Sequence, residues 1–209
     1  MRFLSLNRTF YLWFKILTLG FPQIYLGNRS LNRTFAIEMR HIILITGGER
    51  SGKSTYAEQL ALKLSPTPIY MATAHPWDDE FRQRIRKHQE RRGPQWTNIE
   101  EERYLSRHEV SGRVVLVDCL TLWATNYFFD GEGKEVEKIL EELRNEFDRF
   151  VKQDATFIFV TNEIGMGGVS PNAVQRHFTD LMGWLNQHVA SVADEVVLMV
   201  CGIPMKVKY

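Results

Sequence analysis

The run Gly47–Ser54, which reads GGERSGKS, constrains the fold of this chain more than any other feature. The spacing G-x-x-x-x-G-K-S is typical of a phosphate-binding P-loop. It follows the apolar run 42–45 and precedes a helical pattern over 55–64. Glycines let the backbone expose N–H groups that surround phosphate oxygens together with the N-terminus of the following helix. The pattern predicts a strand, loop and helix that hold a nucleoside triphosphate, and a glycine-rich turn without a ligand is the alternative.

Two side chains of this loop have predicted chemical roles. Lys53 is expected to reach the β- and γ-phosphates, and the hydroxyl of Ser54 is expected to ligate Mg²⁺. The rest of the predicted phosphate-binding loop consists of Gly47, Gly48, Glu49, Arg50, Ser51 and Gly52.

Composition narrows the class of protein further. A chain of 209 residues with 44% hydrophobic composition suits one globular domain with a substantial core. The formal net charge of +1 argues against a general binder of nucleic acids or membrane surfaces. Cys119 and Cys201 stand in apolar runs without metal-ligand spacing, which predicts two reduced, buried thiols and a cytoplasmic protein.

The first 38 residues do not match the rest of the chain. The sequence SLNRTF occurs at 5–10 and again at 30–35, and the apolar run 10–19 between them is too short to span a bilayer comfortably. Met39 stands immediately before the first predicted strand. We expect the biological start at Met39, with 39–209 as a single nucleotide-binding domain. A membrane anchor near the N-terminus is the alternative.

From His41 onward, short apolar runs alternate with helical patterns. The amphipathic pattern over 136–151 and a second over 174–189 predict helices. Continuous apolar runs of this length are typical of parallel strands buried on both faces. The predicted fold is therefore α/β, a P-loop (RecA-like), mostly parallel sheet flanked by helices. The predicted strands are His41–Thr46, Ile69–Thr73, Val114–Asp118, Thr156–Thr161 and Glu195–Val200.

The C-terminal run VVLMVCGIPMKVKY predicts two strands joined by a tight turn at Gly202-Ile203-Pro204. The last strand would then be antiparallel and would form an edge of the sheet. Pro204 and Lys206 suit an edge strand.

Ligands of such sheets bind at the carboxyl ends of the strands, so the residues that follow the strands are candidates for one site. Asp118 ends an apolar strand and is predicted to hold Mg²⁺ directly or through water. The glycine-rich run 161–168 follows the fourth predicted strand and suits either a lid loop or a plain connection.

The segment 81–92 carries six basic side chains around His88. A solvated helical face is the simpler interpretation of such a charge run. Because the run follows the second strand, near the predicted phosphates, its cations could instead bind a triphosphate. His88 could then act as a base or a nucleophile.

Together these segments resemble a known family. The resemblance runs from about Met39 to the C-terminus through TGGERSGKS, MATA, RIRKHQERRGPQW, VVLVDCLTLWATN, TFIFVTNEIGMGG and ADEVVLMVCGIPMKVK. These segments resemble the bifunctional adenosylcobinamide kinase/adenosylcobinamide-phosphate guanylyltransferase family of cobalamin biosynthesis. Many families share the P-loop, whereas the histidine segment and TNEIGMG are more specific.

The resemblance implies two reactions that use GTP or ATP with Mg²⁺. A nucleoside triphosphate phosphorylates the aminopropanol hydroxyl of adenosylcobinamide. GTP then gives its guanylyl group to a histidine, from which adenosylcobinamide phosphate takes GMP to form adenosyl-GDP-cobinamide. The resemblance also implies a homo-oligomer, typically a trimer.

On the matching positions, the resemblance implies that His88 is the guanylylated residue and that Lys53 is part of the catalytic machinery. Lys87 stands where some members carry a second histidine, and Gly93 stands where members often carry proline. The other residues that the resemblance places at the nucleotide are Thr73, Ala74, His75, Gln89, Glu90, Arg91, Arg92, Glu100 and Asp118.

Two other interpretations are open at this point. The chain could be another P-loop small-molecule kinase in which His88 has no covalent role. Alternatively, it could be a nucleotide-binding regulator tethered to a membrane through residues 10–26.

Overall fold

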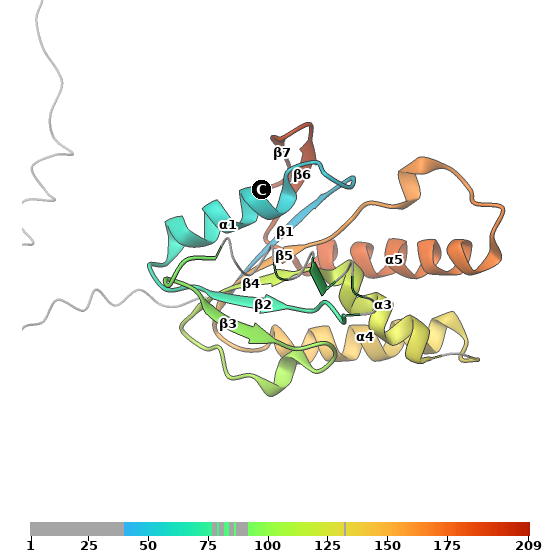
Figure 1. Cartoon of the computed structure of the whole chain (residues 1–209), viewed down its shortest axis with the longest axis horizontal. Coiled ribbons are helices and arrows are strands. Elements are labelled where there is room, and N and C mark those ends of the chain that lie inside the picture. The colour runs from blue at the N-terminus through green and yellow to red at the C-terminus, as the bar shows by residue number, and fades with distance from the viewer. Residues whose placement is uncertain (1–39, 77–78, 80–81, 84–85, 87–91, 132) are drawn as a thin grey trace, which may run out of the picture. The chain divides into compact units, whose positions relative to one another are not determined.

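The computed structural model describes residues 40–76, 79, 82–83, 86, 92–131 and 133–209 (Figure 1). The N-terminal extension, the predicted start at Met39 and the alternative membrane anchor lie outside these residues. The described residues form one sheet in the order β3-β2-β4-β5-β1-β6-β7. Its strands are β1 (His41–Gly47), β2 (Ile69–Ala72), β3 (Thr97–Glu100), β4 (Val114–Asp118), β5 (Thr156–Val160), β6 (Glu195–Val200) and β7 (Ile203–Lys208).

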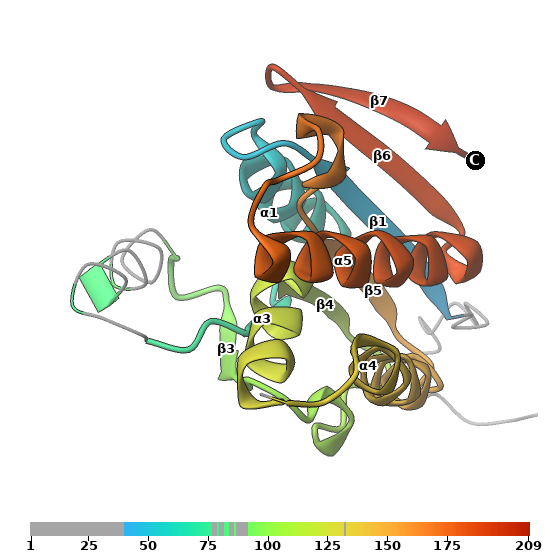
Figure 2. The same ribbon diagram turned by 90° about the vertical axis from the view of Figure 1, so that its right-hand side faces the viewer.

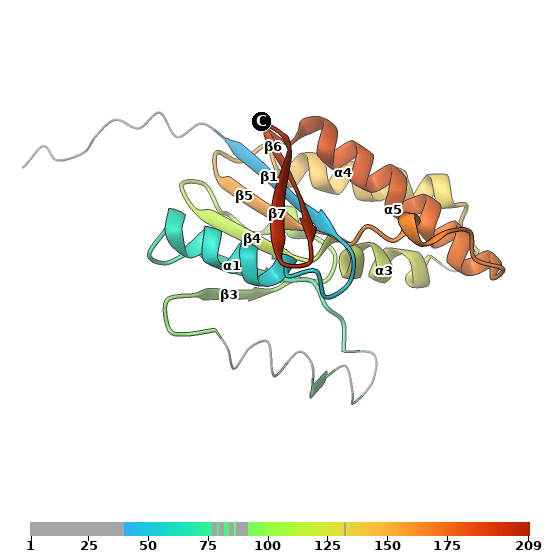
Figure 3. The same ribbon diagram turned by 90° about the horizontal axis from the view of Figure 1, so that it is seen from above.

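Helices cover both faces of the sheet. On one face α1 (Lys53–Leu64) packs against β1, β4 and β5. Other helices of the described residues cover the opposite face, as Figures 1 and 3 show. They are α3 (Leu120–Asp130), α4 (Val136–Phe150) and α5 (Ala173–Val192). Single 3₁₀ turns form at η1 (Leu105–Arg107) and η2 (Gly165–Gly167). The predicted α/β architecture is confirmed.

The core lies in two layers because successive strand residues point to opposite faces of the sheet. On β1, Ile43 and Ile45 pack with α1, whereas Ile42 and Leu44 belong to the larger cluster under the other three helices. That cluster is rich in aromatic rings. Phe147 and Phe159, for example, are fully buried, and their ring centroids are 5.1 Å apart.

The β6–β7 hairpin confirms the predicted antiparallel edge but corrects the predicted turn. Val200 pairs with Ile203, so the turn is Cys201-Gly202, and Ile203 and Pro204 already belong to β7 (Figure 2). Both turn residues have positive φ, 51° at Cys201 and 82° at Gly202. Two positive φ angles are what a two-residue hairpin turn needs to match the twist of its strands.

The two cysteines differ in exposure, which corrects the prediction that both are buried. Cys119 is buried and free, whereas Cys201 is free and exposed. Cys201 is exposed because it forms the hairpin turn rather than continuing the apolar strand β6.

Strand β3 was not predicted from the sequence. Its residues Thr97–Glu100 contain one apolar side chain, Ile99, and the strand pairs with β2 at the edge of the sheet. An edge strand buries little surface, so it needs no apolar run. Among the described residues, no helix is long and apolar enough to cross a membrane.

The order of the strands decides where the predicted site residues meet. Strands β1 to β6 are mutually parallel, and β5 lies between β1 and β4. The carboxyl ends of β1, β4 and β5 therefore lie next to one another on the same side of the sheet, where the P-loop begins (Figure 3).

Candidate active site

The P-loop connects the end of β1 to the start of α1, and two residues between them have positive φ angles, which are unfavourable for residues other than glycine. Arg50 has φ 57°, and Gly52, the residue before the helix, has φ 95°. Positive φ is accessible to glycine at no steric cost, which explains the glycine at position 52. The loop therefore reaches the N-terminus of α1 in a conformation that suits anion binding.

Lys53 is held inside the loop. Its side chain is buried, and its Nζ donates to the carbonyl oxygen of Gly48 at 2.6 Å and to Oγ of Ser51 at 3.5 Å. Burial lowers the pKa of Lys53, and the nearby carboxylates of Asp118 and Glu49 partly oppose that shift. A poorly solvated cation of this kind gains strongly from an anion at close range.

Neighbouring segments brace the loop on two sides. The N–H of Gly202 in the hairpin turn donates to the carbonyl oxygen of Ser51 at 2.9 Å. After β5, the N–H of Glu163 donates to the carbonyl oxygen of Gly47 at 3.0 Å. The hairpin and the glycine-rich connection thus fix the P-loop that they flank.

Gly47 provides a stringent test of this packing. A Cβ at position 47 would lie 2.5 Å from the carbonyl oxygen of Met199 and 2.9 Å from Oγ of Ser51. The backbone of Gly47 also has a φ of 149°, which other residues rarely adopt. We expect Gly47→Ala to destabilise the fold by about 1–3 kcal/mol, through strain and overpacking. Nucleotide affinity should fall with it. The matched control is Gly48→Ala, because a Cβ there meets nothing within 4 Å. Thermal unfolding and nucleotide titration check both variants, and equal stability of the two would contradict the packing argument.

A cavity of about 680 Å³ brings the P-loop together with the ends of β4 and β5. The ends of β1, β4 and β5 therefore meet at this cavity, whereas Thr73, Ala74 and His75, which follow β2 and were expected to join them, do not line it. Its lining includes the loop residues Glu49 to Thr55, together with Asp118, Cys119, Leu122, Val160, Asn162 and Ile164.

The oxygen donors in this cavity fit a magnesium ion. Ser54 and Asp118 both line it, and hydroxyl and carboxylate oxygens are ligands that Mg²⁺ accepts. Among the described residues, no three or more His, Cys, Asp or Glu side chains cluster in a way that could hold a metal. That is consistent with Mg²⁺, which usually takes one or two protein ligands and completes its shell with phosphates and water.

Asp118 is held by a residue that the sequence did not single out. The hydroxyl of Tyr70 on β2 donates to Oδ2 of Asp118 at 2.5 Å, and Tyr70 is 1% exposed. The guanidinium of Arg92 lies over the Tyr70 ring, 3.3 Å from its centroid, and Trp96 contacts the ring edge-on at 5.5 Å. Arg92, a predicted nucleotide-binding residue, therefore reaches Asp118 through Tyr70.

Thr73 also acts on this part of the site. Its Oγ1 donates to the carbonyl oxygen of Cys119 at 2.8 Å and accepts from the N–H of Cys119 at 3.0 Å. The side chain of Asn126 donates to the carbonyl oxygen of Thr73 at 2.8 Å. Thr73 is fully buried, so it orders the end of β4 rather than lining the cavity itself.

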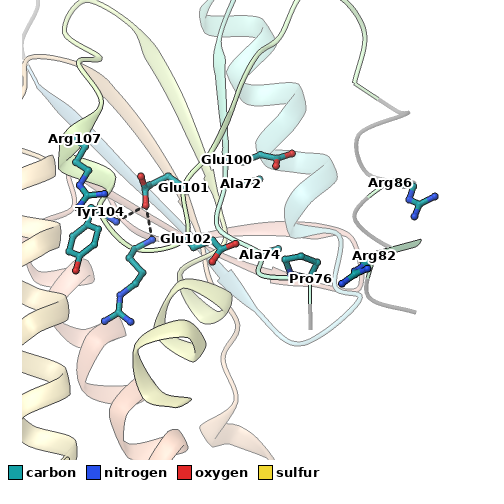
Figure 4. Close-up of a pocket in the computed structure, with 11 residues that line it drawn as sticks. Ala72, Ala74, Pro76, Arg82, Arg86, Glu100, Glu101, Glu102, Tyr104 and Arg107 are labelled. Carbon is teal, nitrogen blue, oxygen red and sulfur yellow. Dashed lines mark hydrogen bonds between the residues drawn. The ribbon is translucent and has the colours of Figure 1, made fainter. Parts of the chain in front are cut away.

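A second cavity, of about 700 Å³, lies at the ends of β2 and β3. Figure 4 shows Arg82 and Arg86 on one side of it and Arg107 on the other, with Glu100 and Glu102 between them. Ala74 and Glu100 are the predicted nucleotide-binding residues that line it. His75 lies nearby, with Nδ1 2.9 Å from Oε2 of Glu102.

Glu101, which also lines this cavity, is held by the backbone that follows it. Oε1 of Glu101 accepts from the N–H groups of Arg103 and Tyr104 at 2.9 and 2.8 Å (Figure 4). Burial opposes ionisation of Glu101, but these two bonds and His108 more than offset it and lower its pKa. Glu101 therefore supports the loop and lines the cavity together with Glu100 and Glu102.

The predicted residues His88, Gln89, Glu90 and Arg91 lie outside the described residues. In sequence they stand between Arg86, which lines the second cavity, and Arg92, which covers Tyr70. Tyr70 was missed because a buried tyrosine in an apolar run is ordinarily a core residue. No signal in the sequence marked it, because its pairing level with Leu116 of β4 is a contact between distant segments.

A family comparison decides which kind of P-loop protein this is. The sequence model described as cobinamide kinase / cobinamide phosphate guanyltransferase matches residues 43–207, a span that contains the lining of both cavities. The chain belongs to this family.

Individual relatives agree with this assignment. The chain is 39% identical over 176 residues to the bifunctional adenosylcobalamin biosynthesis protein CobP of Pseudomonas aeruginosa. The alignment covers 79% of this chain and 96% of that protein. It is 36% identical over 181 residues to the bifunctional adenosylcobalamin biosynthesis protein CobU of Escherichia coli, covering 80% of this chain and 99% of that protein. The resemblance proposed from the motifs is confirmed.

Proposed function

We propose that this chain acts in adenosylcobalamin biosynthesis, where it phosphorylates adenosylcobinamide and then transfers GMP from GTP to the phosphorylated product. The single observation that best supports the proposal is that two cavities lie at the carboxyl ends of the strands. One contains the P-loop with Lys53, Ser54 and Asp118, and the other combines Glu100 with arginines. A family whose name joins a kinase to a guanyltransferase needs both a phosphate site and room for a second substrate.

In the kinase reaction, the aminopropanol hydroxyl oxygen of adenosylcobinamide attacks the γ-phosphorus of ATP or GTP. The bond to the β–γ bridging oxygen breaks, the nucleoside diphosphate leaves, and the hydroxyl proton passes to solvent. Lys53 and the P-loop N–H groups stabilise the charge on the β- and γ-phosphates. When bound, Mg²⁺ supplies further positive charge at these oxygens, and Ser54 and Asp118 would hold it.

In the guanylyl transfer, an imidazole nitrogen of His88 attacks the α-phosphorus of GTP and pyrophosphate leaves. A phosphate oxygen of adenosylcobinamide phosphate then attacks the same phosphorus, which releases the imidazole and forms adenosyl-GDP-cobinamide. Neutral imidazole is a good nucleophile near pH 7, and splitting the transfer into two steps lowers each barrier.

The remaining predicted nucleotide residues fit this scheme in different ways. Ala74 and Glu100 line the second cavity, where Arg82 and Arg86 could pair with phosphates. His75 is placed beside that cavity by Glu102, and Arg92 acts near Asp118 through Tyr70. We assign Gln89, Glu90 and Arg91 to the nucleotide on the family resemblance.

The assembly and extent of the enzyme follow the same reasoning. We infer that residues 39–209 carry both reactions, because the family match spans 43–207 and contains the lining of both cavities. We also infer a homo-oligomer on the family resemblance, with cobinamide and nucleotides as its partners rather than nucleic acid.

Product analysis tests the proposal. The protein is incubated with adenosylcobinamide, Mg²⁺ and GTP, with the label at either the α- or the γ-phosphate, and corrinoids are separated and weighed by mass spectrometry. We expect γ-label in a first corrinoid product and α-label in a second. A γ-labelled product without any α-labelled one would reduce the enzyme to a P-loop kinase, and no labelled corrinoid would overturn the proposal.

A further inference from the structure

Tyr70 takes part in neither proposed reaction, yet its hydroxyl bonds to the carboxylate of Asp118. Tyr70 is buried in the layer under α1, among side chains such as Ile45 and Leu116 that are purely apolar. A hydroxyl in such a layer is costly unless it is bonded, and this one is bonded to the carboxylate that lines the P-loop cavity. Packing alone would be served equally well by phenylalanine.

We propose that Tyr70 is a positioning residue that orients the Asp118 carboxylate toward the Mg²⁺ of the bound nucleotide. The inference rests on the proposed function only in taking Ser54 and Asp118 as the residues that hold the ion. It adds a residue that touches neither nucleotide nor metal.

The geometry gives Tyr70 a restricted role. Its hydroxyl donates to Oδ2, and this bond fixes the rotation of the carboxylate about its last side-chain bond. Partners that orient a metal-binding carboxylate in this way commonly contribute 10- to 100-fold to metal affinity.

The ring itself is clamped. Arg92 covers one face at 3.3 Å, and Trp96 meets the ring edge-on at 5.5 Å and an interplanar angle of 80°. Arg92 is in turn anchored by donating from Nη1 to Oδ1 of Asn98 on β3 at 3.1 Å. The unpredicted edge strand β3 thus stabilises Arg92, Arg92 stabilises the Tyr70 ring, and the ring sets the carboxylate.

The test uses nucleotide binding rather than turnover. The probe is guanosine 5′-[α,β-methylene]triphosphate, whose α–β linkage cannot be cleaved, so His88 cannot be guanylylated. Its dissociation constant is measured by calorimetry in Mg²⁺ and in EDTA, and the ratio of the EDTA value to the Mg²⁺ value is the metal enhancement. In Tyr70→Phe we expect this enhancement to fall about 10-fold, with the EDTA value unchanged within about twofold.

Two further variants make the result specific. Tyr127→Phe is the matched control, because Tyr127 is 4% exposed and its hydroxyl donates to the carbonyl oxygen of Arg103 instead. It should lose similar stability and keep the full metal enhancement. Asp118→Asn should lower the metal enhancement as Tyr70→Phe does. The double variant should lower it little further than Asp118→Asn alone, because both changes disrupt the same hydrogen-bonded pair of tyrosine and carboxylate.

Three results would overturn the inference. An unchanged enhancement in Tyr70→Phe, with a reduced one in Asp118→Asn, would leave the tyrosine as core packing. Equal weakening in EDTA and in Mg²⁺ would show that Tyr70 supports the loop and not the carboxylate. If neither variant changed the metal enhancement, Asp118 would not be a residue that holds the metal. None of these depends on guanylyl or phosphoryl transfer, so failure of the proposed reactions would be seen separately in the product analysis.

Discussion

Lys53→Ala is expected to lower phosphoryl transfer to adenosylcobinamide by about 10²- to 10³-fold. The side chain is 7% exposed and points into the loop, where Nζ lies 2.6 Å from the carbonyl oxygen of Gly48. Among the residues that the structure describes, the lining of the P-loop cavity supplies one further cation, Arg50, which has a left-handed backbone conformation. Alanine would therefore leave the developing charge on the β- and γ-phosphates with backbone donors and Mg²⁺ alone.

The same variant should keep its stability. Burial lowers the pKa of Lys53, which means that the folded protein disfavours the charge that the lysine carries at neutral pH. Removing that charge should leave the melting temperature unchanged or slightly raised. The matched control is Lys63→Ala, in the exposed last turn of the same helix α1, which should retain full activity. Steady-state kinetics and thermal unfolding separate the outcomes, and a Lys53→Ala protein with normal turnover would remove the lysine from the machinery.

His88→Ala is expected to separate the two reactions. Guanylyl transfer should fall by about a thousandfold or more, because the proposed covalent acceptor would be gone, while phosphorylation of adenosylcobinamide should persist. The measurement is a denaturing gel after incubation with GTP labelled at the α-phosphate. Wild-type protein should carry an acid-labile, alkali-stable label, as a phosphoramidate does, and the variant should carry none.

The control for this experiment is another histidine on the surface. His177 is exposed on α5, away from the basic segment in sequence, so His177→Ala should be labelled like the wild type. A label that survives in His88→Ala would move the nucleophile to another residue. Loss of both reactions in this variant would instead show that His88 helps to bind the nucleotide shared by the two steps.

The sequence alone determined the architecture, which the structure confirms, and it predicted the phosphate site, because both depend on local patterns. A glycine-rich turn with Lys53 and Ser54 allows few structures, and continuous apolar runs such as those of β1 and β5 are compatible with little besides buried parallel strands. Asp118 was found for the same reason, since a carboxylate at the end of an apolar strand stands out.

What the sequence could not determine depends on contacts between distant segments. Strand β3 is polar and short, and it exists because β2 offers an edge to pair with. The predicted turn started one residue and ended two residues after the observed turn at Cys201-Gly202, because strand pairing, rather than the proline, decides where the hairpin reverses. The role of Thr73 likewise appeared only when β2 and β4 were placed side by side.

Tyr70 shows the limit most clearly. In sequence it is one apolar-compatible residue of the strand IYMA, and nothing local separates it from its neighbours. Its contacts come from Asp118, 48 residues later, and from Arg92, 22 residues later. The parallel pairing of β2 with β4 brings the tyrosine hydroxyl to the carboxylate. Motifs therefore predicted the groups that would touch the nucleotide, whereas only the tertiary structure showed the residue that bonds to one of them, because such a contact depends on how distant segments pack.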